Sequence, residues 1–109
     1  MKVSYANIEI QKICTNPKAL KKALGNNAKF LQKRLDQLDE AANLELLRNV
    51  AGNFHELTSD RKGQLACSIT GKLRLIFTPD HIPLPTKPDG GLNWAKVTAV
   101  TNIEIVDYH

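Results

Sequence analysis

The chain has 109 residues, of which 42% are hydrophobic, and carries a formal net charge of +4. This length predicts one domain, residues 1–109, with a single modest hydrophobic core. The apolar runs are too short for a membrane span, and residues 1–12 lack the apolar stretch of a secretory signal. We therefore expect a cytoplasmic protein, and the positive charge suits a polyanionic partner such as nucleic acid or an acidic protein.

The two cysteines, Cys14 and Cys67, lie far apart and match no paired metal-ligand spacing. In a reducing cytoplasm, two free and buried thiols are favoured over a disulfide. The sequence also offers no acidic cluster for a metal ion, so we expect neither a metal nor another cofactor.

Capping residues predict helices in the first half of the chain, after a short strand at 2–6. Asn7 is a candidate N-cap for a short helix. In the next helix Asn16 is the candidate N-cap, Pro17 the first helical residue and Gly25 the stop.

A longer helix is predicted for "AKFLQKRLDQLDEAA", beginning after Asn26 or Asn27. Four apolar side chains fall on one face at helical spacing, and polar side chains fall away from it. The apolar set is Phe30, Leu31, Leu35 and Leu38, and the polar set is Lys33, Arg34, Asp36 and Gln37. Asn43 is expected to cap a last short helix.

After Gly52 the pattern becomes that of strands. "QLACSIT" and "KLRLIF" flank Thr70-Gly71, which predicts a β-hairpin. Leu65, Cys67 and Ile69 share one face of its first strand, and Leu73, Leu75 and Phe77 share one face of its second, with Arg74 and Ile76 opposite. A long last strand is predicted for 94–109, with Val97, Ala99, Ile103 and Ile105 on one face. Helices followed by an antiparallel sheet indicate an α+β fold.

Residues 78–93 separate the hairpin from the last strand and contain four of the five prolines. Because proline cannot donate to a strand ladder, this segment is predicted to be a long loop. It is either an insertion without a role or a lid or partner-contact loop.

Two histidines, several cations and one aromatic side chain suggest a nuclease site. If the last strand pairs near the hairpin, the sheet can collect them in one concave patch. An acid, a base and fixed cations are what cleavage by a 2′-hydroxyl attack on the neighbouring phosphate requires, and an aromatic ring can stack on a base. Solvated surface charge is the alternative for each of them. The set is His55, Arg61, Lys62, Arg74, Tyr108 and His109.

The block "HELTSDRKGQLACSITGKLRLIF" followed by "VTAVTNIEIVDYH" resembles the HigB-like toxins of the RelE/ParE superfamily. The segment "DGGLNWAKVTAV" is similar to a subfamily described as plasmid maintenance system killer proteins. This resemblance implies a microbial-ribonuclease-like fold, with helices packed on an antiparallel sheet. It also implies a ribosome-dependent endoribonuclease of mRNA, held inactive by a helix-turn-helix, HigA-like antitoxin.

By position, the resemblance assigns His55 to the histidine before the hairpin and Arg74 to the phosphate-contacting strand arginine. Asp107, Tyr108 and His109 match the closing triplet, in which the histidine is the main acid or base. The sequence departs from this pattern at Thr58-Ser59, where the family has Lys-Gly. Arg61 and Lys62 are the cations that can compensate for the absent lysine.

Two other functions stay open. ParE-type relatives share the fold but inhibit DNA gyrase without nuclease chemistry, and a degenerate toxin would bind only its antitoxin. A basic helix surface is expected to meet ribosomal RNA or an acidic antitoxin. That surface comprises Lys18, Lys21, Lys22, Lys29, Lys33 and Arg34.

Overall fold

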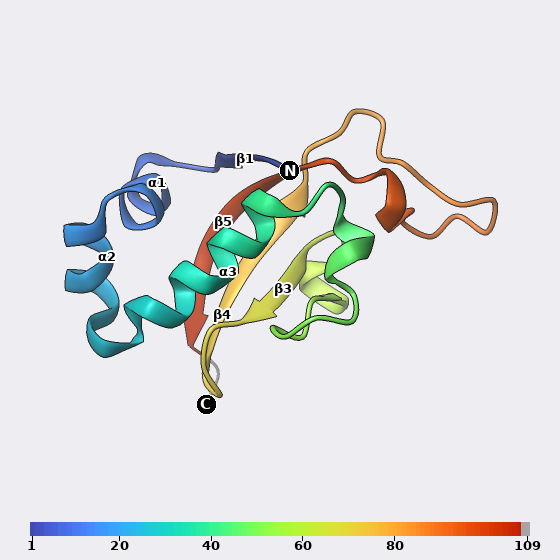
Figure 1. The fold of residues 1–109 in the computed structure, drawn as a ribbon. Helices are drawn as coiled ribbons and strands as arrows, with labels where there is room; N and C mark the ends of the chain where they lie inside the picture. The colour runs from blue at the N-terminus through green and yellow to red at the C-terminus, as the bar shows by residue number, and fades with distance from the viewer. Residues whose placement is uncertain (108–109) are drawn as a thin grey trace.

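The computed structural model describes residues 1–107 and has the predicted α+β architecture (Figure 1). Three helices precede most of the sheet, and four short 3-10 turns connect the elements. The helices are α1 (Ile8–Thr15), α2 (Pro17–Leu24) and α3 (Ala28–Glu40). The strands are β1 (Lys2–Tyr5), β2 (His55–Glu56), β3 (Leu65–Ser68), β4 (Leu73–Pro79) and β5 (Ala99–Asp107). The turns are η1 (Gly25–Asn27), η2 (Leu44–Leu47), η3 (Ser59–Arg61) and η4 (Trp94–Lys96).

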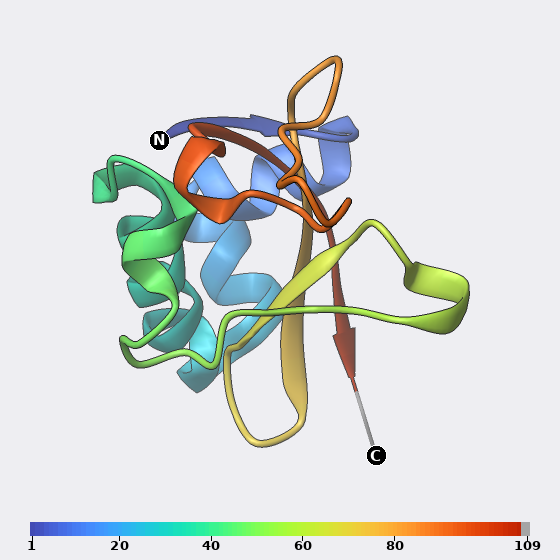
Figure 2. The same ribbon diagram turned by 90° about the vertical axis from the view of Figure 1, so that its right-hand side faces the viewer.

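The sheet has the strand order β1-β5-β4-β3-β2. β5, β4, β3 and β2 pair antiparallel, as predicted, but β1 pairs with β5 in parallel, so the sheet is mixed. Parallel neighbours need a long crossover, and here the whole chain between β1 and β5 provides it. In Figure 2 the helices lie on one side of β4 and β5, and the β2–β3 connection extends toward the other side.

Asparagine side chains cap the N-termini of the first two helices, as predicted. Oδ1 of Asn7 accepts from the Ile10 amide at 3.1 Å, and Oδ1 of Asn16 accepts from the Lys18 amide at 2.9 Å. Gly25 ends α2 with a φ of +55°, which favours glycine. These predictions are confirmed. Each motif could be recognised in the sequence because it depends only on residues within one helical turn.

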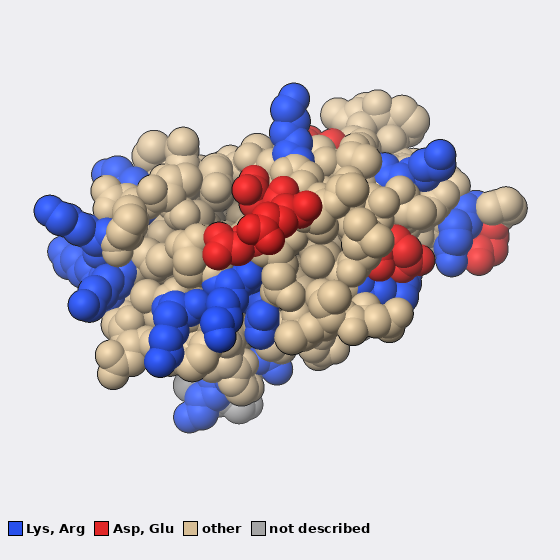
Figure 3. All heavy atoms as spheres, in the orientation of Figure 1, with Lys and Arg blue, Asp and Glu red and all other residues tan. Residues whose placement is uncertain are grey.

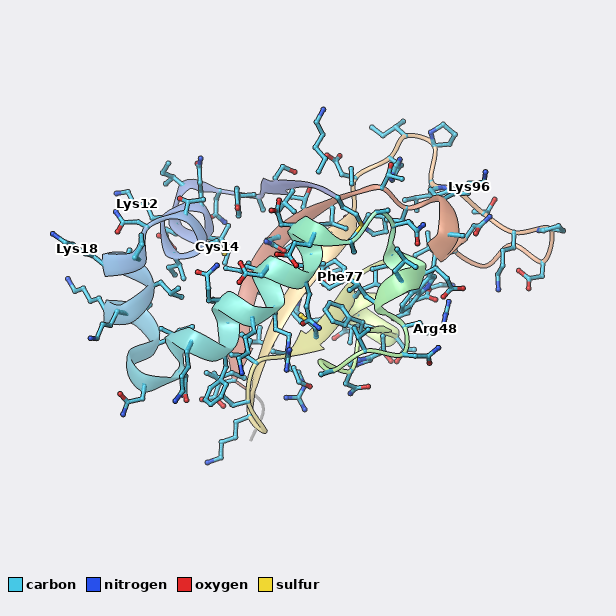
Figure 4. All side chains as sticks on the ribbon, in the orientation of Figure 1. Lys12, Cys14, Lys18, Arg48, Phe77 and Lys96 are labelled. Carbon is cyan, nitrogen blue, oxygen red and sulfur yellow. The ribbon has the colours of Figure 1, made fainter. Side chains whose placement is uncertain are left out.

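The core lies between α3 and one face of the sheet. Leu31 and Leu38 of α3 and Leu75 and Phe77 of β4 are all 0% exposed. Figure 4 labels Phe77, which lies where α3 crosses the sheet. Both predicted apolar strand faces pack here. Arg34 was predicted to point away from this contact, but its Nε donates to the Ser68 carbonyl at 2.7 Å. The long side chain reaches around the edge of α3, so Arg34 is not part of a free basic surface.

The last strand begins later than predicted and contains a bulge. β5 starts at Ala99, because Trp94–Lys96 form η4. Ile76 pairs with Glu104 but Phe77 pairs with Asn102, which leaves Ile103 as an extra residue. The bulge reverses the alternation of side chains. The predicted face was therefore wrong in part. Val97 and Ile105 contact the core as predicted, but Val100 does so in place of Ala99, and Ile103 does not belong to the core.

Both cysteines are free, as predicted. Cys67 is buried and Cys14 is half-buried. Burial raises the pKa of the Cys14 thiol to about 11 and the pKa of Cys67 to about 12. Both thiols therefore stay protonated at neutral pH and are not suited to nucleophilic chemistry.

The proline-rich segment between β4 and β5 is a loop, as predicted, and its two ends are fixed to the domain. Nε2 of His81 accepts from the Thr98 amide at 3.1 Å. Trp94 is buried and donates from Nε1 to Glu56 at 3.0 Å, while the Arg48 guanidinium lies 4.0 Å from its ring centre. Across residues 1–107, no helix has both the length and the apolar character to cross a membrane.

Candidate active site

Arg74 lies on the face of the sheet that is turned away from the helices. Its neighbours Leu75 and Phe77 point into the core, so alternation along β4 places Arg74 and Ile76 on the opposite face. The Arg74 guanidinium donates from Nη1 to the Thr70 carbonyl at 2.9 Å, at the turn between β3 and β4. This bond orients the cation at one end of the sheet face opposite the helices.

The strand register brings His55 to the same face as Arg74. His55 pairs with Ala66, Ala66 with Ile76, and Ile76 with Glu104, so these four residues form one row across the sheet. Neighbouring strands lie about 4.8 Å apart, which separates the His55 and Glu104 backbones by roughly 14 Å. Ala66 and Ile76 are 1% and 0% exposed, so the middle of this row is apolar and covered, and the polar side chains lie at its two ends.

The hydrogen bond of His55 defines its tautomer. Nδ1 lies 2.7 Å from the Asn53 carbonyl oxygen, which can only accept, so Nδ1 carries a proton. In the neutral ring Nε2 is then unprotonated and can act as a base.

Arg61, in the segment between β2 and β3, forms an ion pair with a residue of β5. It belongs to η3, and its guanidinium forms an ion pair with Glu104 and donates to Oε1 of Gln64 at 2.9 Å. The predicted phosphate ligand therefore already has a carboxylate partner. Glu104 was not among the predicted site residues; the single acid within the apolar run "NIEIV" is its signal in the sequence.

The backbone at Ser59 has a left-handed conformation that favours glycine, with a φ of +55°. Lys62 is exposed directly after η3. The turn therefore has a glycine-like backbone at Ser59, and its nearest described cations are Arg61 and Lys62.

Ser59→Gly is expected to raise the free energy of unfolding by about 0.5–1 kcal/mol, because glycine relieves the left-handed strain at this position. Chemical denaturation of both proteins measures the change. Asp60→Gly is the matched control, since Asp60 does not have a positive φ. Equal effects of the two substitutions would contradict this interpretation of Ser59.

The structure describes only the first residue of the closing triplet. Val106 pairs with Arg74 and Asp107 pairs with Leu73, so Asp107 alternates to the side of the sheet opposite Arg74. Tyr108 and His109 lie outside the described residues, and their roles stay predictions.

This face can bind a phosphate and transfer protons. It carries the guanidinium groups of Arg74 and Arg61, the imidazole of His55 and the carboxylate of Glu104. Within residues 1–107, no group of three His, Cys, Asp or Glu side chains is placed to hold a metal ion. The chemistry that these residues themselves offer is acid–base chemistry beside fixed cations.

Solved structures similar to this chain are bacterial toxins. A YoeB/ParE toxin from Agrobacterium tumefaciens matches with a TM-score of 0.58 at 9% identity, over 100% of both chains. A YoeB dimer from Staphylococcus aureus matches with a TM-score of 0.57 at 15% identity, over 100% of this chain and 97% of that one. The fold is that of the YoeB/ParE toxins. The expected RelE-like architecture is thereby confirmed. No family model matches the sequence, and neither does any curated protein.

Proposed function

We propose that this chain is the toxin of a type II toxin–antitoxin system, a HigB-like endoribonuclease that cuts mRNA on the ribosome. The observation that carries the proposal is the register that places His55 and Arg74 on one face of a YoeB/ParE-type fold. Arg61 and the exposed Lys62 lie in the turn between β2 and β3 and supply further cations for the same face.

The proposed reaction is metal-independent. One histidine removes the proton of the 2′-hydroxyl, the oxygen attacks the adjacent phosphate, and a second acid protonates the leaving 5′-oxygen. His109 is the principal acid or base in this scheme, with Nε2 of His55 as its partner. Arg74 stabilises the charge that develops on the phosphate. Tyr108 stacks on or orients the mRNA, and Asp107 sets the environment of the histidine.

The proposed partners are the ribosome, mRNA and a helix-turn-helix, HigA-like antitoxin. α2 contains no acidic residue, and its three lysines are exposed. In Figure 4, Lys12 of α1 and Lys18 of α2 extend from the same end of the molecule. We assign this end to contact with ribosomal RNA or with acidic segments of the antitoxin. The lysines of α2 are Lys18, Lys21 and Lys22.

A gyrase inhibitor or a degenerate toxin is the second candidate. The observation in its favour is the weak phosphate site, because Thr58 carries no charge and Glu104 pairs with Arg61. The two functions differ in the damage they cause. An mRNA nuclease leaves cut transcripts, whereas a gyrase inhibitor causes DNA breaks and an SOS response.

Cleavage mapping in a bacterial cell-free translation reaction tests the proposal. We expect new mRNA 5′ ends with the purified protein, only when ribosomes are present, and none with His109→Ala. Intact mRNA from a folded, antitoxin-free protein would reject the nuclease. Cleavage by His109→Ala at the full rate would reject the assigned catalytic residue.

Glu104→Gln is expected to tighten binding to a short RNA about fivefold, because it removes a negative charge and releases the Arg61 guanidinium from a half-exposed ion pair. Fluorescence anisotropy at fixed salt measures the dissociation constant. Glu9→Gln, an exposed position on α1, is the control for net charge alone. Weaker binding by Glu104→Gln would show instead that the ion pair positions Arg61 for RNA.

A further inference from the structure

Arg34 turns from α3 toward the sheet rather than toward solvent. Figure 3 shows an acidic patch over α3 with a basic patch directly beside it, and Lys33, the neighbour of Arg34, is exposed. The Arg34 side chain is half-buried instead. Its Nε donates to the Ser68 carbonyl at 2.7 Å, and its Nη1 donates to Oε1 of Gln37 at 2.9 Å. Because two of its donors have fixed acceptors, the planar guanidinium is held in one orientation.

Gln37 extends this contact to the segment that leads into β2. While its Oε1 accepts from Arg34, its Nε2 donates to the Ala51 carbonyl at 2.8 Å. The next carbonyl along the chain, that of Gly52, accepts from the Ser68 amide at 2.7 Å. Two successive carbonyls are therefore held, the first by a side chain of α3 and the second by the end of β3.

Gly52 allows the Arg34 side chain to lie directly on this segment. A Cβ atom on Gly52 would lie 3.0 Å from Nε of Arg34 and 2.8 Å from Cε1 of Phe54, so a larger residue does not fit without a shift. The φ of Gly52, +122°, also favours glycine. On the other side of the segment, the buried Phe54 ring packs edge-on against Phe77.

Asn53 lies between these fixed points, and its carbonyl is the acceptor for His55. Its φ is +50°, and its carbonyl oxygen lies 2.7 Å from Nδ1 of the imidazole. The direction of a backbone carbonyl is set by the dihedral angles on either side of it. Here the contacts with α3 hold the chain before Asn53, and the buried Phe54 holds it afterwards.

We propose that Arg34 and Gln37 are positioning residues for His55. From the helix side of the sheet they hold residues 51–53 in the conformation that directs the Asn53 carbonyl at Nδ1. The proton then stays on Nδ1, and Nε2 of the neutral ring can accept one. The positioning is a property of the chain alone, whereas its catalytic meaning rests on the proposed nuclease function.

The tautomer of His55 tests this positioning without an assay of cleavage. Long-range ¹H–¹⁵N correlation spectra at about pH 8, where an ordinary imidazole is neutral, show which ring nitrogen carries the proton. We expect the proton on Nδ1 in the wild type. Arg34→Gln and Gln37→Glu are each expected to lower the ratio of the Nδ1–H to the Nε2–H form about fivefold, as for the loss of one net hydrogen bond. His55→Gln assigns the signals.

The two variants remove different parts of the contact. Arg34→Gln shortens the side chain and removes the guanidinium. Gln37→Glu keeps an acceptor for Arg34 and loses only the donor to the Ala51 carbonyl. Gln37 is half-buried at the surface of α3, so Gln37→Glu keeps the test decisive even if Arg34→Gln does not fold, which circular dichroism checks.

The chain offers three controls. Lys33→Gln removes the same charge from the adjacent, exposed position and should leave the His55 tautomer unchanged. Arg34→Lys keeps the charge but not the planar donor group, and should restore part of the ratio lost in Arg34→Gln. His81 is an internal reference, because its Nε2 accepts from the Thr98 amide and its proton is therefore also on Nδ1. Its signals should be the same in every variant.

An unchanged His55 tautomer in the folded variants would overturn the proposal, and so would an Nε2–H ring in the wild type. An equal loss in Lys33→Gln would also overturn it, since charge alone would then explain the effect. Ribosome-dependent mRNA cleavage by the same proteins separates this result from the proposed function. A wild type that cuts no mRNA rejects the nuclease and leaves the tautomer result standing. In an active nuclease, Arg34→Gln is expected to lower kcat up to about fivefold, with KM nearly unchanged.

Discussion

Arg74→Ala is expected to lower ribosome-dependent mRNA cleavage by about 10²–10³-fold, the loss typical of removing one group that stabilises transition-state charge. The guanidinium is oriented at the sheet face opposite the helices by its bond to the Thr70 carbonyl, so the proposed phosphate contact is positioned in the protein alone. Single-turnover cleavage on stalled ribosomes, read by primer extension, measures the rate.

Two variants separate the catalytic effect of Arg74 from a structural one. Arg74→Lys keeps the charge but loses the planar, two-pronged donor geometry, and should give an intermediate rate. Lys72→Ala removes an exposed cation from the same turn and should leave the rate nearly unchanged. Losing the Thr70 hydrogen bond costs about 1 kcal/mol of stability, which thermal unfolding detects. A normal rate in Arg74→Ala would remove Arg74 from the mechanism.

Asn102→Leu is expected to raise the free energy of unfolding by about 1–3 kcal/mol. Asn102 is 0% exposed, and neither polar atom of its side chain has a hydrogen-bond partner among residues 1–107. A buried amide without partners carries its full desolvation cost, and leucine has a similar shape without that cost. Denaturant unfolding followed by circular dichroism measures the change.

Asn102→Ala is the companion variant, because it removes the amide but also leaves a cavity. Alanine should therefore gain less stability than leucine, or lose some. A less stable leucine variant would show that the Asn102 amide is hydrogen-bonded in solution. In that case Asn102 would stabilise the neighbouring bulge of β5 through that hydrogen bond.

The bulge links the packing of β5 to the composition of the candidate site. It lies between the pairs Ile76–Glu104 and Phe77–Asn102. Without it, strict alternation from the buried Val100 would direct Glu104 toward the helices. With it, Glu104 reaches Arg61 on the face opposite the helices. One extra residue thereby decides whether the predicted phosphate ligand has a carboxylate beside it.

The sequence by itself determined the features that depend on near neighbours along the chain. The Asn7 and Asn16 caps, the Gly25 stop, the Thr70-Gly71 hairpin and the apolar face of α3 are examples. Each is set by contacts between residues a few positions apart, and each was predicted correctly.

Only the tertiary structure decided the features that join distant segments. The parallel pairing of β1 with β5, the bulge at Ile103 and the ion pair of Arg61 with Glu104 all depend on how strands far apart in the chain align. Strand register is chosen by the packing of whole faces against the helices, and a shift of one residue sends every later side chain to the opposite face. The sequence therefore named His55, Arg61 and Arg74 as candidates, and the register showed that Glu104 lies among them.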